Sequence, residues 1–180
     1  MKTASDVGKR IEAYIQRHDW PGARRLIQSQ LRREPGDHWL LTRLSLTYYE
    51  QYDYRRALYI TKKAIKRAPR CPLVLWDHAG ALHMLNCQRE AIAIYRRLVA
   101  RGPRSIATGE CGEGLAQARG LVSDSLYRLG QCYADIGRPK TAVVMLKKAL
   151  AMRGPGCHSI YPLPEVRTKA NQIRRGMHVV

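Results

Sequence analysis

Apolar residues recur every three or four positions along most of the chain, which is the spacing of one face of an α-helix. Short polar stretches interrupt these series, for example between Tyr48 and Ala57. The apolar positions of the three clearest stretches are Leu41, Leu44, Tyr48, Ala57, Leu58, Ala64, Ile65; Leu75, Ala79, Leu82, Ala91, Ile94, Leu98; and Leu126, Leu129, Tyr133, Ala142, Leu146, Ala149. The pattern predicts pairs of amphipathic helices joined by polar turns.

Two residue types mark a repeat with a period of 34 residues. Alanines and prolines keep this spacing over three units, at Ala23, Ala57, Ala91, Pro35, Pro69 and Pro103. Asp19 and Asp53 shortly precede two of these alanines, where an aspartate side chain caps the helix that follows. Two independent markers that keep one period indicate an internal repeat.

A fourth unit follows an insertion. Ala142 lies 51 residues after Ala91, which is one period of 34 plus 17 further residues. The extra residues fall at about 106–122 and include the glycine-rich segment 109–114. Because insertions in repeat proteins often lie on the binding face, this one is a candidate contact surface. The alternative, which we favour, is a flexible loop that connects the third and fourth repeats.

Small residues occupy positions at which paired helices would meet. Ser45, Ala79 and Gly130 fall on the first helix of a pair and would let the second helix approach closely. The order of large, small and aromatic positions at this period resembles the tetratricopeptide repeat (TPR) family, most closely in the fourth repeat. The resemblance implies an all-α solenoid of helical hairpins over residues 4–155. Its four repeats would span about 4–37, 38–71, 72–105 and 123–156.

The C-terminal residues do not form a fifth repeat. Gly154, Pro155 and Gly156 interrupt the helical pattern, and a new helix begins at about Pro164. This helix, predicted at 164–176, is rich in charged and polar residues. Because the last repeat of a solenoid needs a cap with a polar outer face, we expect a C-terminal capping helix.

The TPR resemblance implies a protein-binding scaffold rather than an enzyme, because the first helices of such repeats line a groove that takes peptides. Carried over to this chain, the groove residues are Trp39, Thr42, Leu46, Tyr49, Glu50, Trp76, His83, Met84, Asp124, Tyr127 and Gln131. The aromatic side chains and the flexible Met84 suit a partner with apolar side chains, and the acidic residues suit one that is also basic. The alternative is that another part of the same chain fills the groove.

Composition limits the class of protein. The chain has 180 residues and 45% of them are apolar, which excludes general disorder and a large multidomain enzyme. No apolar run is long enough to span a bilayer, and the N-terminal residues lack the apolar core of a secretory signal. The five cysteines include no CxxC pair, which favours reduced thiols in the cytoplasm. We therefore expect a cytoplasmic protein without a membrane partner.

The chain is strongly basic, with 32 Lys and Arg residues against 14 Asp and Glu and a formal net charge of +18. In a TPR-like fold many of these cations lie on the second helices, which form the convex back. The most prominent are Arg55, Arg56, Lys62, Lys63, Lys66, Arg67, Arg96 and Arg97. This basic face would attract nucleic acid or an acidic partner, or simply keep the protein soluble. The basic runs lack the interleaved aromatics of single-strand binders, so we expect only weak, non-specific nucleic-acid binding.

Motifs for catalysis and metal binding do not occur in the sequence. His78 and His83 are five residues apart, a spacing that does not place them on one helix face as a metal-binding pair. Cys157 and His158 have no partners at zinc-finger spacing. We expect no enzyme activity, no metal and no cofactor. The expected partner is a protein or peptide, and self-association through an incompletely capped end is an open alternative.

Overall fold

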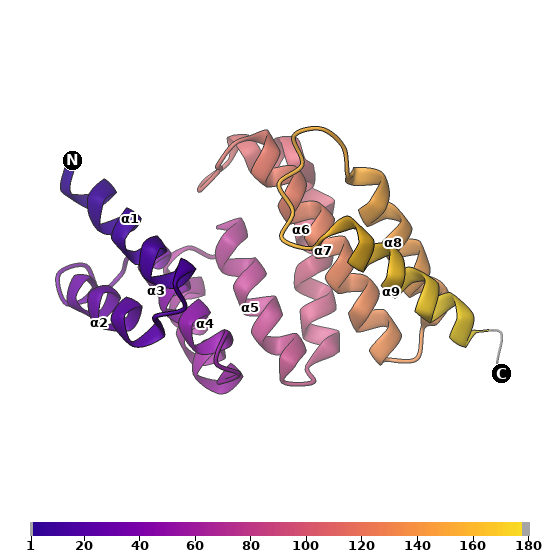
Figure 1. Cartoon of the computed structure of the whole chain (residues 1–180), viewed down its shortest axis with the longest axis horizontal. Helices are drawn as coiled ribbons and strands as arrows, with labels where there is room; N and C mark the ends of the chain where they lie inside the picture. Colours follow the sequence, from indigo (N-terminus) through magenta and orange to yellow (C-terminus); the bar gives the residue numbers. More distant parts are fainter. Residues whose placement is uncertain (1, 178–180) are drawn as a thin grey trace. The chain divides into compact units, whose positions relative to one another are not determined.

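The computed structural model describes residues 2–177, with side chains from Asp6 onward. Within this range it contains nine α-helices and no β-strand, so the predicted all-α fold is confirmed (Figure 1). Among these helices, none has the length and apolar character needed to cross a membrane. The helices are α1 (Lys2–Gln16), α2 (Trp20–Leu31), α3 (His38–Tyr49), α4 (Tyr54–Arg67), α5 (Pro72–Met84), α6 (Gln88–Thr108), α7 (Leu115–Asp135), α8 (Pro139–Met152) and α9 (Leu163–Gly176).

Aspartates cap three of the early helices. The side chains of Asp19, Asp37 and Asp53 each accept a hydrogen bond from the backbone N–H three residues later, at 2.8, 3.0 and 3.0 Å. The caps predicted at Asp19 and Asp53 are confirmed, and Asp37 adds a third. Prolines open α5 and α8, where the missing N–H costs no helical hydrogen bond. These helix starts therefore follow from the local sequence.

The chain divides into two compact units, and the first, Met1–Leu85, contains α1 to α5. All five helices contribute to its core, which includes Ile11, Ala23, Ile27, Leu40, Leu41, Leu44, Ile60, Ala64 and Val74. Each helix packs on the next, and α3 also contacts α5. Ser45 is small enough for α3 to approach α4 closely. Its hydroxyl donates a hydrogen bond of 3.2 Å to the carbonyl oxygen of Ala57 on α4.

The second unit, Asn86–Val180, contains α6 to α9 in its described part. α6 is kinked at Gly102, whose φ is 69°. Gly130 brings α7 against α8, because a Cβ there would lie 2.7 Å from the Leu146 side chain. α9 coincides with the predicted C-terminal helix, packs on α8 and buries Val166 in the core of this unit.

The insertion at 106–122 differs from the expected loop. α6 continues to Thr108 and α7 begins at Leu115, so only residues 109–114 lie between the two helices. The helical parts of the insertion are held by apolar side chains that enter the core, namely Ile106, Ala118 and Val122. The extra residues thus lengthen two helices that pack along each other, and the expectation of a loop applies only to 109–114.

Candidate functional site

In the first unit, α3 and α5 are in contact and present a surface that we call the α3–α5 face. Its residues recur at helical spacing on one side of each helix, and all of them are half-buried or exposed. They are Trp39, Leu46 and Tyr49 on α3, Glu50 at its C-cap, and Leu73, Trp76, Asp77 and Met84 on α5. Aromatic, flexible and acidic side chains therefore share one surface.

Trp39 lies where this face meets α1. A Cβ at Gly8 of α1 would be 3.6 Å from the Trp39 ring, so the two helices approach closely there. The guanidinium of Arg43 lies 5.6 Å from the centre of the same ring, which is a cation–π contact. Both contacts fix the position of the indole, so it is pre-organised for any further contact.

Three charged side chains, one each from α1, α3 and α5, lie close together on this side of the unit. Nη1 of Arg43 is 3.3 Å from Oε1 of Glu12. Burial raises the pKa of Asp77 to about 7, and the positive charge of Arg43 opposes this rise. Arg43 is already paired with Glu12, which partly neutralises its charge. A second cation placed beside Asp77 would lower the pKa of that carboxyl and favour its ionised form.

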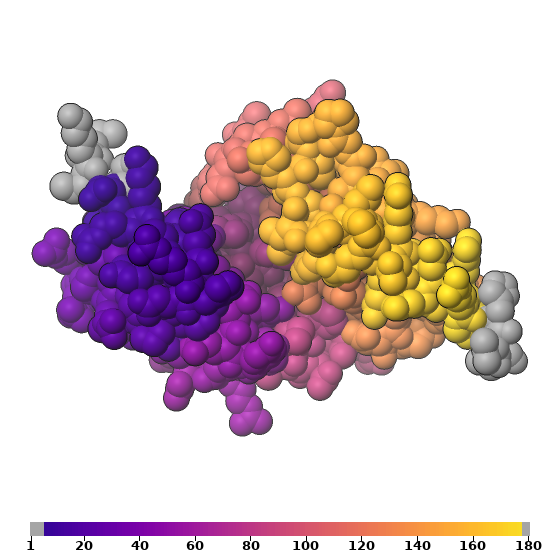
Figure 2. All heavy atoms as spheres, in the orientation of Figure 1, coloured from indigo at the N-terminus to yellow at the C-terminus, as the bar shows by residue number. Residues whose placement is uncertain are grey.

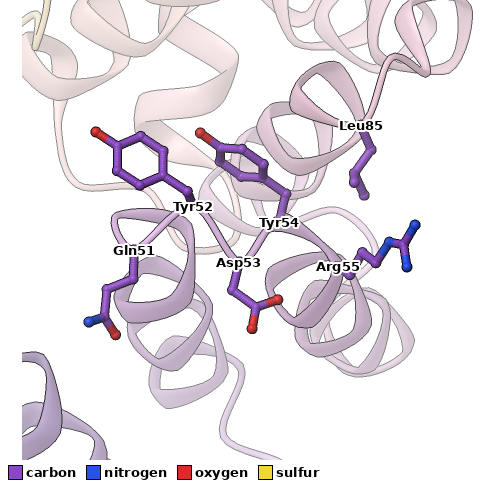
Figure 3. Close-up of a pocket in the computed structure, with 6 residues that line it drawn as sticks. All are labelled: Gln51, Tyr52, Asp53, Tyr54, Arg55 and Leu85. Carbon is purple, nitrogen blue, oxygen red and sulfur yellow. The ribbon is translucent and has the colours of Figure 1, made fainter.

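A hollow of about 390 Å³ lies at the turn between α3 and α4. Its lining residues are Gln51, Tyr52, Asp53, Tyr54, Arg55 and Leu85 (Figure 3). The rings of Tyr52 and Tyr54 project to the same side of the turn, whereas Gln51 and Asp53 point away from them. Tyr54 also packs edge-on against Tyr49, with ring centres 5.2 Å apart. The hollow is therefore an aromatic extension of the α3–α5 face.

The predicted groove residues of the first unit do not all reach the surface. Trp39, Leu46, Tyr49 and Trp76 are half-buried, and Glu50 and Met84 are exposed. In contrast, Thr42 is fully buried and its hydroxyl donates a hydrogen bond of 2.7 Å to the carbonyl oxygen of Trp39. His83 is buried as well. Thr42 and His83 therefore take part in packing and do not belong to the α3–α5 face.

The predicted groove residues of the fourth repeat are covered by the chain itself. Asp124 is 3% exposed, Tyr127 is 2% exposed and Gln131 is half-buried. The covering segment is residues 157–165, which we call the C-terminal arm. Its last three residues form the start of α9. In Figure 2 the residues that precede and form α9 lie over the visible face of the second unit.

The C-terminal arm makes specific polar and aromatic contacts with α7. Asp124 accepts hydrogen bonds from the hydroxyl of Ser159 and from the backbone N–H of Ile160, the latter at 3.1 Å. The ring centres of Tyr161 and Tyr127 are 4.4 Å apart. The Tyr127 hydroxyl donates to Oε1 of Glu165, an α9 residue within the arm, at 2.7 Å, and Nε2 of Gln131 donates to that hydroxyl at 3.2 Å. The internal filling that the sequence left open thus occurs in the fourth repeat.

Gly120 lies one helical turn before Asp124, and the arm passes close to α7 at this residue. A Cβ at this position would collide with the carbonyl oxygen of His158, so only glycine leaves room for the arm. The backbone N–H of His158 donates to the carbonyl oxygen of Ala116 at 3.2 Å. Ala116, Gly120, Asp124 and Tyr127 follow one side of α7, and together they form a continuous seat for the arm.

Asp124 is an acid buried beside a cation. Burial raises its pKa, whereas the hydrogen bonds from Ser159 and Ile160 and the charge of Arg153 favour the ionised form. Nη2 of Arg153 lies 3.5 Å from Oδ1 of Asp124, and its Nη1 donates to the carbonyl oxygen of Tyr161 at 2.6 Å. These contacts account for the acidic groove position of the fourth repeat without any external partner.

All eight basic residues singled out from the sequence are exposed. Six of them lie on α4 in the first unit, and Arg96 and Arg97 lie on α6 in the second. α4 contains no acidic residue. Tyr59 lies among its cations and is 61% exposed, so this basic surface carries an aromatic side chain that the expectation from sequence did not include.

Comparisons with known proteins support the resemblance drawn from the repeat. Residues 124–151 match the sequence profile of the tetratricopeptide repeat. The fold is similar to that of MamA, with a TM-score of 0.68, 18% identity and coverage of 93% of this chain and 84% of that chain. YrrB, described as a TPR protein with an unusual peptide-binding site, gives a TM-score of 0.65 at 15% identity, covering 92% and 71%. TTC0263 from Thermus thermophilus, described as a thermophilic TPR protein, gives 0.65 at 16% identity, covering 92% and 78%.

The search of curated proteins gave no match to this sequence. The helical hairpins, the period of 34 residues and the matched fourth repeat nevertheless agree with one another. The chain is a helical-repeat protein with the TPR fold, and the resemblance to that family is confirmed.

Proposed function

We propose that this protein is a non-catalytic scaffold whose α3–α5 face binds an extended segment of another protein. The observation that carries the proposal is the C-terminal arm, because the first helix of the fourth repeat already holds an extended segment through its groove positions. Interaction scaffolds are common among TPR proteins, and the structural neighbour YrrB is described as having a peptide-binding site. Fold alone does not fix function, so the site itself must support the proposal.

Trp76 is the residue of the first unit that corresponds to Tyr127. The two are 51 residues apart, which is the period of 34 plus the insertion of 17. Tyr127 holds the ring of Tyr161 by aromatic packing. By analogy, Trp76 would hold an aromatic or aliphatic side chain of a partner, and Met84 would adapt to its shape.

The charges of the α3–α5 face define the rest of the partner. Glu50 is exposed, whereas Asp77 is partly exposed as a residue but has a carboxyl group buried deeply enough to raise its pKa to about 7. A Lys or Arg side chain that approached Asp77 would favour its ionised form and gain a charge-assisted hydrogen bond. The preferred segment would therefore contain an aromatic or large aliphatic residue near a basic one.

Selection from a random peptide library tests this function. Selected peptides should bind the wild-type protein. Trp76→Ala should lower their affinity about tenfold or more, because buried tryptophans are common hot spots of binding energy. Trp20→Ala is the matched control, since Trp20 is a half-buried tryptophan on the second helix of the first repeat. The proposal fails if no peptide is enriched, or if both variants reduce binding equally.

A further inference from the structure

α4 presents a basic surface that is separate from the α3–α5 face. Its cations recur along the exposed side of the helix, at Arg55, Arg56, Lys62, Lys63, Lys66 and Arg67. They are interspersed with buried residues of the opposite side, Ala57, Ile60, Thr61 and Ala64. The helix is thus held in the core by one side and offers six positive charges on the other.

Acidic residues of the first unit do little to neutralise this surface. Asp53 forms an ion pair with Arg56 at 3.3 Å, but both side chains are open to solvent and such pairs are weak. Among residues 6–177, no carboxylate forms an ion pair with Arg55, Lys62 or Lys63. Asp19 and Asp37 are used as caps of α2 and α3. The surface therefore retains a concentrated positive charge.

Tyr59 adds an aromatic ring to the centre of the surface. It is 61% exposed, so much of its side chain is open to solvent. Nζ of Lys63 lies over one face of its ring, 4.4 Å from the ring centre, in a cation–π contact that leaves the other face for stacking. Arg55 and Lys62 are one turn before and one turn after Tyr59 on the same side of the helix.

We propose that the α4 surface binds single-stranded nucleic acid, with phosphates on Arg55, Lys62, Lys63 and Lys66 and a base stacked on Tyr59. Positive charge alone would favour any polyanion, since neutralised phosphates release their counterions. The exposed ring favours a single strand over a duplex or an acidic protein, because only unpaired bases offer a free face for stacking. From Arg55 to Lys66 the helix extends about 16 Å, enough for several consecutive phosphates.

The test is fluorescence anisotropy with a labelled single-stranded oligouridylate. Its affinity is compared with that of a duplex RNA of the same length. Lys62→Gln/Lys63→Gln should weaken binding about tenfold at moderate salt, and the slope of log K against log salt should fall by about 1.4. Tyr59→Ala should weaken it about fivefold or more, whereas Tyr59→Phe should bind as the wild type does. All of these side chains are exposed, so the thermal stability of the variants should be unchanged.

Matched controls separate this site from diffuse attraction. Arg174→Gln/Arg175→Gln removes the same charge from exposed positions on α9 and should have little effect. An equal loss in both double variants would overturn the proposal, as would equal affinity for the duplex or no effect of Tyr59→Ala. Displacement by polyglutamate at equal charge concentration would assign the surface to an acidic protein instead. Trp76→Ala should leave this binding intact, so the two proposals fail independently.

Discussion

Asp77 and His78 are neighbours on α5 whose pKa values shift in opposite directions. Burial raises the pKa of Asp77 to about 7. Burial, helped by the charge of Lys62, lowers the pKa of His78 to about 4. Nδ1 of His78 is 2.9 Å from the hydroxyl of Thr61, which itself donates a hydrogen bond of 3.0 Å to the carbonyl oxygen of Leu58. Both groups are therefore neutral in the folded protein between about pH 4 and about pH 7.

The two residues should affect the pH dependence of stability with opposite signs. Between about pH 6.5 and pH 4 the unfolded chain binds a proton at His78 that the folded protein does not, so acidification destabilises through this group. Over the same range the folded protein holds a proton on Asp77 that the unfolded chain has lost, so acidification stabilises through that group. When the pH is lowered from about 7 to about 5, the free energy of unfolding of His78→Gln should change in a more stabilising direction than that of the wild type. The free energy of unfolding of Asp77→Asn should change in a more destabilising direction than that of the wild type.

Urea midpoints of the wild type and both variants at about pH 7 and about pH 5 measure this difference directly. The comparison with the wild type removes the contributions of all other titrating groups. Profiles that shift in the same direction for both variants would contradict the opposed shifts of Asp77 and His78.

At the residue scale, the sequence indicates which positions of a first helix point toward a groove but not which of them stay open. Trp76 and Tyr127 occupy the same repeat position, yet only Tyr127 is covered by the C-terminal arm. Thr42 also has the register of a groove residue, but it is small enough to be buried beside its own helix. The burial of Tyr127 depends on a segment that is distant in the sequence, which periodicity does not describe.

At the element scale, α7 and the C-terminal arm pack together as one structural unit. The arm crosses α7 at Gly120, donates its backbone N–H at Ile160 to Asp124 and places Tyr161 on Tyr127. It then continues into α9, which buries Val166. The arm therefore joins the groove side of the last repeat to its cap.

Gly120→Ala tests whether this seat contributes to stability. The added Cβ has to displace the arm from α7, and overpacking of this kind costs about 1–3 kcal/mol. Gly154→Ala is the control, because nothing lies within 4 Å of a Cβ at that position. Urea denaturation should show a lower free energy of unfolding for Gly120→Ala alone. Equal stability of the two variants would mean that the arm does not rest on Gly120 in solution.

The helical hairpins are the elements that the sequence predicts best. Their apolar spacing, their small residues at Ser45 and Gly130 and their aspartate caps are local signals, and the structure uses all of them. The insertion was harder to predict, because the glycines at 109–114 suggest a loop while Ile106 and Val122 extend the flanking helices into the core. The arm has no periodicity, and the signal for it is a glycine inside a helix, Gly120, which marks close approach of another backbone.

At the scale of the whole molecule, this protein separates two kinds of surface onto different helices. The first helices of the repeats carry aromatic and acidic side chains, whereas the second helices carry 16 of the 32 Lys and Arg residues against six on the first helices. The net charge of +18 is therefore not spread evenly over the chain. Such a division suits a scaffold that holds one partner through apolar contacts and another through charge.

The measurement that tests the central proposal most directly is amide chemical-shift mapping of a library-selected peptide on the isotope-labelled protein. The α3–α5 face should respond, with the largest changes around Trp39, Tyr49, Trp76 and Met84, and the tryptophan side-chain signals of Trp39 and Trp76 should move while that of Trp20 does not. Changes confined to α2 and α4, or to the C-terminal arm and α7, would contradict peptide binding at the α3–α5 face.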